Sequence, residues 1–164
     1  MEGPVAIVGY MGCGKTTVGR ALASKLGWEF VDLDRAITKA TGSAISEIFR
    51  ASGEEHFRNL EHRALLDVLD GTPERVVACG GGIILRPENR KLLGRTAAVF
   101  LMEEVNTLYG RTRGGDRPLR ADSLEAFERR YAERLPLYEE VAELKVEIQG
   151  RPPTQVAEEI ARWL

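Results

Sequence analysis

Cysteine is scarce in this chain, and two cysteines are too few for a disulfide scaffold. The spacing of Cys13 and Cys79 also matches no zinc site. No apolar run approaches the roughly 20 residues that a membrane-spanning helix needs. The first residues lack the basic start of a signal peptide, so we expect a reduced, cytoplasmic protein that enters no membrane.

An excess of positive charge is missing too. The chain has 23 Lys and Arg against 25 Asp and Glu, a net charge of -2. A partner such as nucleic acid or an anionic membrane would favour a basic face, and we expect neither. At 164 residues, with no repeat or linker, the chain has the length of one domain spanning residues 1–164. We expect it to act as a monomer.

Short apolar runs alternate with helical segments along the whole chain. The expected strands are residues 4–8, 29–33, 76–79, 97–102 and 144–148. One expected helix follows the first strand and ends at residue 26, and a helical region runs from about 35 to 70 with breaks near 41–43 and at Gly53. A helix is expected over residues 87–93, and another follows the fourth strand. The last two expected helices cover 123–135, which Pro136 would end, and 153–164. This alternation predicts a three-layer α/β/α fold with a central five-stranded parallel sheet. Ligands of such sheets bind beyond the carboxyl ends of the strands.

Residues 9–16 read G-Y-M-G-C-G-K-T and match the phosphate-loop pattern G-x-x-x-x-G-K-[ST], between a strand and a helix as the motif requires. We call them the phosphate loop. Glycines let backbone N–H groups turn toward a phosphate, and the helix N-terminus adds its positive end. Lys15 would place a charge at the β- and γ-phosphates, and the Thr16 hydroxyl would bind Mg²⁺. The alternative is a glycine-rich turn with an incidental lysine. We expect a site for ATP and Mg²⁺.

The third expected strand runs into glycines and offers no acid for the metal, so the carboxylate must come from elsewhere. Asp32 and Asp34 are two apart at the end of the second expected strand, and would therefore project to the same side. We expect Asp32 to join Thr16 at the magnesium, through water, and Asp34 to orient or deprotonate an acceptor hydroxyl. A solvated strand end is the alternative.

Three further segments are suited to an anionic acceptor or to phosphates. Arg58 could pair with Glu61 and present its guanidinium to a carboxylate, or the two could form only a surface ion pair. Residues 80–82 are glycines that would admit a ligand close to the backbone, or form only a flexible turn. Residues 112–122 combine glycines and charges suited to a mobile lid, or to a plain solvated loop.

The two cysteines flank the same expected strand-end cleft. We expect inert thiols, with weak redox sensitivity as the alternative.

Taken together, the phosphate loop and the segments V-D-L-D, F-R-N-L-E, G-G-G, D-R-P-L and R-L-P-L-Y resemble the shikimate kinase family over nearly the whole chain. The resemblance implies a P-loop kinase that moves the ATP γ-phosphate to the 3-hydroxyl of shikimate, a step of chorismate and aromatic amino-acid biosynthesis. It implies a substrate-binding region over residues 33–61 and a lid over 112–122.

The resemblance also implies roles for individual residues. Lys15 and Arg117 would compensate charge on the transferred phosphate, and Asp34 would orient the hydroxyl. The shikimate contacts would be Asp34, Arg58, Gly80, Gly81 and Arg134. The nucleotide contacts would be Gly12, Cys13, Gly14, Lys15, Thr16, Thr17, Arg111, Arg117 and Arg151, the arginines at 111 and 151 lying near adenine. From the residues alone, Arg134 could be only a charge near a helix C-terminus.

Two other functions share part of these features. A kinase for gluconate or a nucleoside monophosphate would have the loop and the lid, but would not call for the F-R-N-L-E, G-G-G and R-L-P-L-Y set. A nucleotide-dependent regulatory module would need neither an acid placed for an acceptor nor arginines for its carboxylate. A guanine-specific switch would also need an N-K-x-D segment, which the chain lacks.

Overall fold

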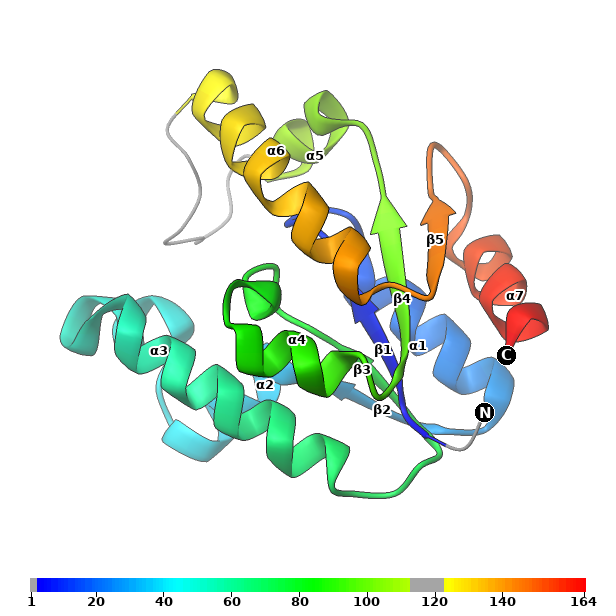
Figure 1. Cartoon of the computed structure of the whole chain (residues 1–164), viewed down its shortest axis with the longest axis horizontal. Helices are drawn as coiled ribbons and strands as arrows, with labels where there is room; N and C mark the ends of the chain where they lie inside the picture. Colours follow the sequence, from blue (N-terminus) through cyan, green and yellow to red (C-terminus); the bar gives the residue numbers. More distant parts are fainter. Residues whose placement is uncertain (1–2, 113–122) are drawn as a thin grey trace.

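A computed structural model describes residues 3–112 and 123–164 of the chain (Figure 1). Five strands form one parallel sheet in the order β2-β3-β1-β4-β5. Their bounds are β1 Val5–Val8, β2 Glu29–Asp32, β3 Arg75–Ala78, β4 Ala97–Met102 and β5 Leu144–Glu147. The predicted five-stranded parallel sheet is confirmed.

Helices cover both faces of this sheet. The described helices are α1 Lys15–Leu26, α2 Leu33–Thr41, α3 Ile45–Leu69, α4 Pro87–Leu93, α5 Val105–Arg111, α6 Leu124–Val141 and α7 Pro153–Trp163, with a 3₁₀ turn η1 at Ile83–Leu85. Helices α1 and α7 pack together on one side, and α3, α4 and α6 lie on the other (Figure 1). The three layers agree with the predicted α/β/α class. Among the described residues, no helix has the length and apolar character to cross a bilayer.

The central strands are apolar along their whole length because helices cover both of their faces. All four residues of β1 are fully buried, and five of the six in β4 are buried. In the strand register, Ile7 of β1 pairs with Ala78 of β3 and with Val99 of β4. The segments that follow these strands therefore emerge along one edge of the sheet.

The second strand is one residue shorter than predicted. β2 ends at Asp32, and Leu33 already begins α2. Asp32 is the N-cap of that helix, and its side chain accepts hydrogen bonds from the backbone nitrogens of Asp34 and Arg35, 3.1 and 3.3 Å away. An aspartate that satisfies free N–H groups in this way favours a helix start over strand extension. The prediction that Asp32 and Asp34 share one face of a strand was therefore wrong.

The prediction that Pro136 ends its helix was also wrong, because α6 continues through it to Val141. A proline inside a helix costs about 3 kcal/mol, since it lacks an N–H and crowds the preceding turn. One side of the turn beyond it is buried. Tyr138 is fully buried and stacks on Phe100 at 5.0 Å between ring centroids, and Val141 is 4% exposed. Burial of two such side chains contributes ~1.5–3 kcal/mol each, which is enough to offset the proline.

The predicted breaks in the long helical region are confirmed. Gly42 closes α2 in the left-handed region with φ 70°, and Gly53 interrupts α3 with φ 80° and ψ 176°. Both conformations favour glycine because other residues rarely adopt a positive φ. The kink at Gly53 lies five residues before Arg58, so a new helical turn begins just ahead of that arginine.

Candidate active site

The phosphate loop lies directly beyond the buried strand β1 and leads into α1. Gly14 is the N-cap of α1 with φ 85°, and Gly12 also has φ 85°. At Gly9, with φ 153°, a Cβ would lie 2.7 Å from the Cys13 sulfur and 2.9 Å from the Leu101 carbonyl oxygen. The glycines are therefore required for backbone conformation and for close packing. The predicted strand–loop–helix context is present.

Lys15 is held against this loop. Its Nζ donates to the carbonyl oxygens of Gly9 and Tyr10, at 2.9 and 3.1 Å. The ammonium group therefore lies at the N-terminus of a 12-residue helix, where the helix dipole and the charge both favour an anion.

A pocket of about 570 Å³ opens beside the loop at the carboxyl ends of the strands. Its size is within the range of small-molecule sites. Most residues singled out from the sequence line it: Gly12, Gly14, Lys15, Thr16, Thr17, Asp32, Asp34, Arg58, Gly80, Gly81, Arg111 and Arg134. Segments from six parts of the chain thus meet at one cavity, as expected of a parallel sheet.

Thr16 and Asp32 are in direct contact, as expected for two residues at one metal. The Thr16 hydroxyl donates to Asp32 Oδ2 at 2.8 Å. Among the described residues, no three His, Cys, Asp or Glu side chains gather as a metal site. Two oxygen donors alone suit a magnesium ion that takes its remaining ligands from phosphate and water.

Asp34 lies in the first turn of α2 and lines the same pocket. One of its carboxylate oxygens, Oδ1, would be 3.3 Å from a Cβ built on Gly80. The carboxylate therefore faces the glycine segment 80–82 across the pocket. The two aspartates do meet at one site, because the cap geometry of α2 brings them there and not because they alternate along a strand.

Arg58 and Glu61 form a buried ion pair. Arg58 Nη1 donates to Glu61 Oε2 at 2.7 Å, and the two side chains are 8% and 1% exposed. A second carboxylate, that of the half-exposed Glu54, lies 3.2 Å from Nη2. The alternative of a surface ion pair was wrong, because the glycine segment and the helix cover the pair.

Burial dominates the electrostatics of this pair. It raises the pKa of the Glu61 carboxyl above its ordinary value, and the charge and hydrogen bond of Arg58 oppose that shift without cancelling it. The second oxygen, Oε1, is buried and accepts no hydrogen bond from the residues that the structure describes. Glu61 lines the pocket beside Gly80, so this oxygen belongs to the acceptor side of the site.

The glycine segment 80–82 is packed tightly between α3 and α6, so the alternative of a flexible turn was wrong. A Cβ on Gly80 would lie 2.6 Å from Glu61 Oε1, and one on Gly82 would lie 2.4 Å from two nitrogens of Arg58. The carbonyl oxygen of Gly81 accepts hydrogen bonds from the Tyr138 hydroxyl and from Arg134 Nη1, the latter at 3.4 Å.

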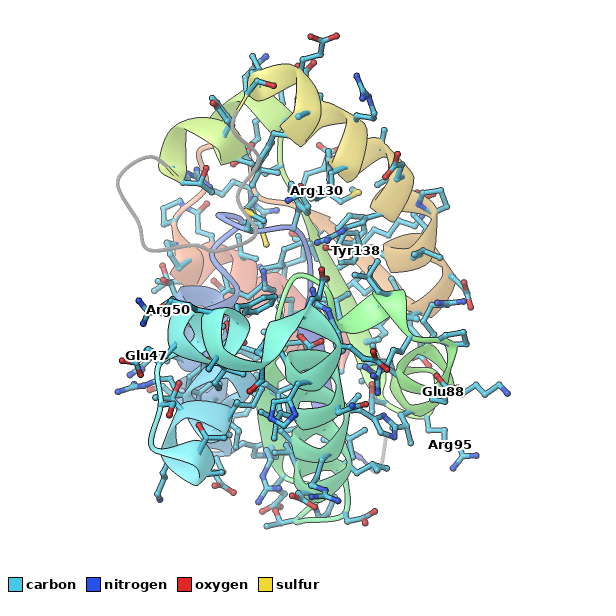
Figure 2. The ribbon with its side chains drawn as sticks, turned by 90° about the vertical axis from the view of Figure 1, so that its left-hand side faces the viewer. Glu47, Arg50, Glu88, Arg95, Arg130 and Tyr138 are labelled. Atoms are coloured by element: carbon cyan, nitrogen blue, oxygen red, sulfur yellow. The ribbon has the colours of Figure 1, made fainter. Side chains whose placement is uncertain are left out.

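Arg134 lies inside α6, seven residues before its end, and is 8% exposed. Its guanidinium carbon lies 5.6 Å from the ring centroid of Tyr10 in the phosphate loop. The alternative of a charge at a helix C-terminus was therefore wrong. Figure 2 shows Arg130 and Tyr138, on either side of it in sequence, on the inner side of α6 that faces the body of the molecule.

The three arginines expected at the nucleotide lie differently. Arg111 lines the pocket and binds the Gly12 carbonyl at 3.3 Å and Glu103 at 3.2 Å. Arg151 instead binds the Glu147 carbonyl and the Glu159 carboxylate, and it is not among the residues that line the described pocket. Arg117 and the expected lid beyond Thr112 lie outside the described residues.

Both cysteines are free and buried. Burial raises the pKa of the Cys79 thiol strongly, which keeps it from forming the reactive thiolate. The expectation of inert thiols is supported.

Three residues in or behind the pocket received no role from the sequence. Phe49 and Phe57 line the pocket as an apolar wall, with ring centroids 4.7 Å apart. Tyr138 does not line it, but its hydroxyl donates to the Gly81 carbonyl oxygen and so fixes the glycine segment. Helical spacing indicated that Phe57 is buried, but not what it faces. Tyr138 belongs to the R-L-P-L-Y segment, and that motif was the available signal.

Comparison with known proteins gives a consistent result. The family model described as shikimate kinase matches residues 11–164. A shikimate kinase of Halorhodospira halophila is 46% identical, over 98% of this chain and 92% of the relative. One of Thermodesulfovibrio yellowstonii is 40% identical, over 96% and 92%. The solved structure of a shikimate kinase from Acinetobacter baumannii in complex with shikimate has a TM-score of 0.91 and 38% identity, over 98% of this chain and 92% of that chain.

Proposed function

The chain belongs to the shikimate kinase family, and we propose that its pocket transfers the γ-phosphate of ATP to the 3-hydroxyl of shikimate, giving shikimate 3-phosphate. It is an ATP-dependent phosphotransferase with an alcohol acceptor, in the pathway to chorismate and the aromatic amino acids. One observation carries the proposal: a phosphate loop and two buried arginines, Arg58 and Arg134, line the same pocket.

The donor side of the pocket is the phosphate loop. Backbone N–H groups and Lys15 bind the β- and γ-phosphates, and Gly12, Cys13, Gly14, Thr16 and Thr17 complete the cradle. Thr16 and Asp32 would hold Mg²⁺, which neutralises phosphate charge when bound. Their hydroxyl and carboxylate oxygens, 2.8 Å apart, suit that ion. The family resemblance assigns Arg111 to the adenine, and its hydrogen bond to the Gly12 carbonyl oxygen in the phosphate loop supports a role on the donor side.

The acceptor side is built for a small polyol that carries a carboxylate. Arg58 and Arg134 bind the carboxylate, for which a guanidinium is well shaped. Gly80 and Gly81 let the ring approach the backbone, and Asp34 takes the hydroxyl that is phosphorylated. With both substrates held in one pocket, positioning and charge compensation supply most of the rate acceleration.

Two further nucleotide-side assignments rest on the family resemblance. Arg117, in a lid over residues 112–122, compensates charge on the transferred phosphate together with Lys15. Arg151 lies near the adenine. The structure gives Arg151 partners in Glu147 and Glu159, so this contact needs the side chain to leave the Glu159 carboxylate, 2.6 Å away.

We also propose that the protein works as a monomer in the cytoplasm. Among the described residues, one large apolar side chain, that of Leu85, is more than a third exposed, at 37%. The described surface therefore has no broad apolar patch for a partner. Sedimentation velocity should give a single species near 18.2 kDa. A stable dimer at micromolar concentration would contradict the monomer.

The experiment that tests the function compares acceptors. Purified protein with ATP and Mg²⁺ is given shikimate, gluconate or a panel of nucleoside monophosphates, and ADP release is measured with a coupled assay. Shikimate should be the preferred acceptor by at least about a hundredfold in kcat/KM. Equal or faster turnover with gluconate or a monophosphate would assign the site to another kinase. Nucleotide binding without transfer to any acceptor would favour a regulatory module.

A further inference from the structure

Helix α3 and the glycine segment 80–82 are joined by a partly buried polar chain that the proposed reaction does not use. His62 Nδ1 lies 2.6 Å from Asn89 Oδ1, and the Asn89 amide nitrogen donates to the Ile83 carbonyl oxygen at 3.0 Å. Asn89 is fully buried, as is Ile83. The chain thus runs from α3, through the first turns of α4, to the residue that follows the glycines.

Each end of this chain lies next to a proposed substrate contact. His62 follows Glu61 and lies four residues, or one helical turn, after Arg58. Ile83 follows Gly82, and its backbone nitrogen donates to the Gly80 carbonyl oxygen at 3.1 Å. Ile83 is therefore bonded on both sides, to the glycine turn through its nitrogen and to Asn89 through its oxygen.

The spacing between α3 and the glycine segment matters for Arg58. The Arg58 guanidinium lies so close to Gly82 that a Cβ there would be 2.4 Å from two of its nitrogens. Glu61 Oε1 lies equally close to Gly80, because a Cβ built on that glycine would be 2.6 Å from it. A small change in the distance between the two segments would therefore move the arginine or open a gap beside it.

Asn89 is suited to fix that distance because both ends of its amide are used. Its nitrogen faces a carbonyl oxygen, so its oxygen faces His62, and Nδ1 of His62 must carry a proton. A buried amide that loses either partner retains an unsatisfied polar atom, and this cost favours a shift of α3 relative to the glycine segment. On the outer surface, Arg86 and Asn59 form a second link between the same segments at 2.6 Å, but that link is exposed to solvent.

We propose that His62 and Asn89 are positioning residues that set the distance between α3 and the glycine segment, and thereby place Arg58 for the acceptor carboxylate. This inference rests on the proposed function, because it assigns the two residues to the acceptor side of that site. Neither residue lines the pocket, so both act through others. Their loss should weaken shikimate binding and leave ATP binding intact.

The test is a set of matched variants. His62→Leu and Asn89→Leu remove the chain, and we expect each to raise the KM for shikimate about tenfold, corresponding to ~1.4 kcal/mol, with the KM for ATP within about twofold. His62→Asn should restore near wild-type values, because the asparagine Nδ2 occupies nearly the place of the histidine Nδ1. His56→Leu, an exposed change on the same helix, is the control and should change neither constant.

Two measurements separate a positioning role from a merely structural one. Shikimate dissociation constants, determined by calorimetry on the folded variants, should follow the KM values. In ¹⁵N-histidine spectra, Nδ1 of His62 should be protonated in the wild type and should lose that signature in Asn89→Leu. Lower stability with unchanged shikimate binding, or equal increases in both KM values, would overturn the proposal. If wild-type protein fails to phosphorylate shikimate, the proposed function fails instead.

Discussion

Replacing Gly82 with alanine places a methyl group against the Arg58 guanidinium. The constructed Cβ would lie 2.4 Å from Nη1 and Nη2 and 2.5 Å from Cζ. The backbone itself should tolerate the change, because Gly82 has φ -101°, a value that alanine adopts. The substitution therefore acts on the position of one side chain, which the structure places between Gly82 and Glu61.

The size of the effect follows from how firmly Arg58 is held. The Arg58 side chain is 8% exposed, and its guanidinium lies 2.7 Å from the carboxylate of Glu61, a side chain that is 1% exposed, so the guanidinium can yield only by loosening that pair. Overpacking a buried site costs about 1–3 kcal/mol, and breaking a buried ion pair on one side costs about 3–5 kcal/mol. Glu54 is 52% exposed and offers a weak alternative partner. We expect Gly82→Ala to lower the free energy of unfolding by about 2–4 kcal/mol.

Urea unfolding and steady-state kinetics measure the two consequences. The KM for shikimate should rise at least about tenfold, a loss of ~1.4 kcal/mol, while the KM for ATP stays within about twofold. Gly81→Ala is the control for unfolding, since its Cβ would have its nearest neighbour at 3.5 Å, an ordinary contact, and should cost under about 1 kcal/mol. A Gly82→Ala protein with wild-type stability and shikimate KM would refute the placement of Arg58.

Four further predictions concern the charged and thiol groups. Asp34→Asn should abolish transfer but leave nucleotide affinity in the presence of Mg²⁺ within about twofold by calorimetry; a parallel loss of nucleotide binding would contradict its assignment to the acceptor. Arg134→Ala should raise the KM for shikimate at least about tenfold and that for ATP little, whereas equal increases would remove its role as a carboxylate clamp. Because burial raises the pKa of Glu61 above 4.5, its contribution to stability is fully present below that pH and is lost as pH rises through the raised pKa. The free energy of unfolding of wild type minus that of Glu61→Gln should therefore fall with rising pH, and a flat or rising difference would contradict the shift. Thiol reagents should leave activity unchanged, since Cys13 and Cys79 are buried, and rapid inactivation would show an accessible thiol.

The features that the sequence predicted best are local ones. The phosphate loop depends on eight consecutive residues between an apolar strand and a helix, and both the spacing and the flanking elements are visible in the chain. The contact of Thr16 with Asp32 was also predicted, because parallel strands end along one edge of the sheet. The pairing of Arg58 with Glu61 followed from their separation of three on a helix.

The errors arose where a local preference met a stronger tertiary or capping effect. Asp32 ended the strand early because its side chain caps α2. Pro136 failed to end α6 because Tyr138, in the turn that follows, is buried against β4 and the glycine segment. The burial of Arg58 was not predictable from α3 alone, since part of its cover comes from residues 80–82 of another segment.

Contacts between distant segments could not be read from the sequence. His62 and Asn89 are 27 residues apart and belong to helices whose relative position depends on the whole layer. Arg151 shows the opposite case, in which a residue implied by family resemblance has its side chain turned toward Glu159. Residue spacing along the chain does not determine with which of several charged neighbours a long side chain will form an ion pair.

The central claim is that one pocket joins an ATP phosphate loop to a shikimate site. It is tested most directly by incubating the protein with ATP, Mg²⁺ and shikimate, weighing the product by mass spectrometry and locating the phosphate by NMR. The account predicts one ADP for each shikimate phosphorylated, with the phosphate on the 3-hydroxyl, and no product from a Lys15→Ala protein. ATP hydrolysis without phosphorylated shikimate, or a phosphate on another hydroxyl, would contradict it.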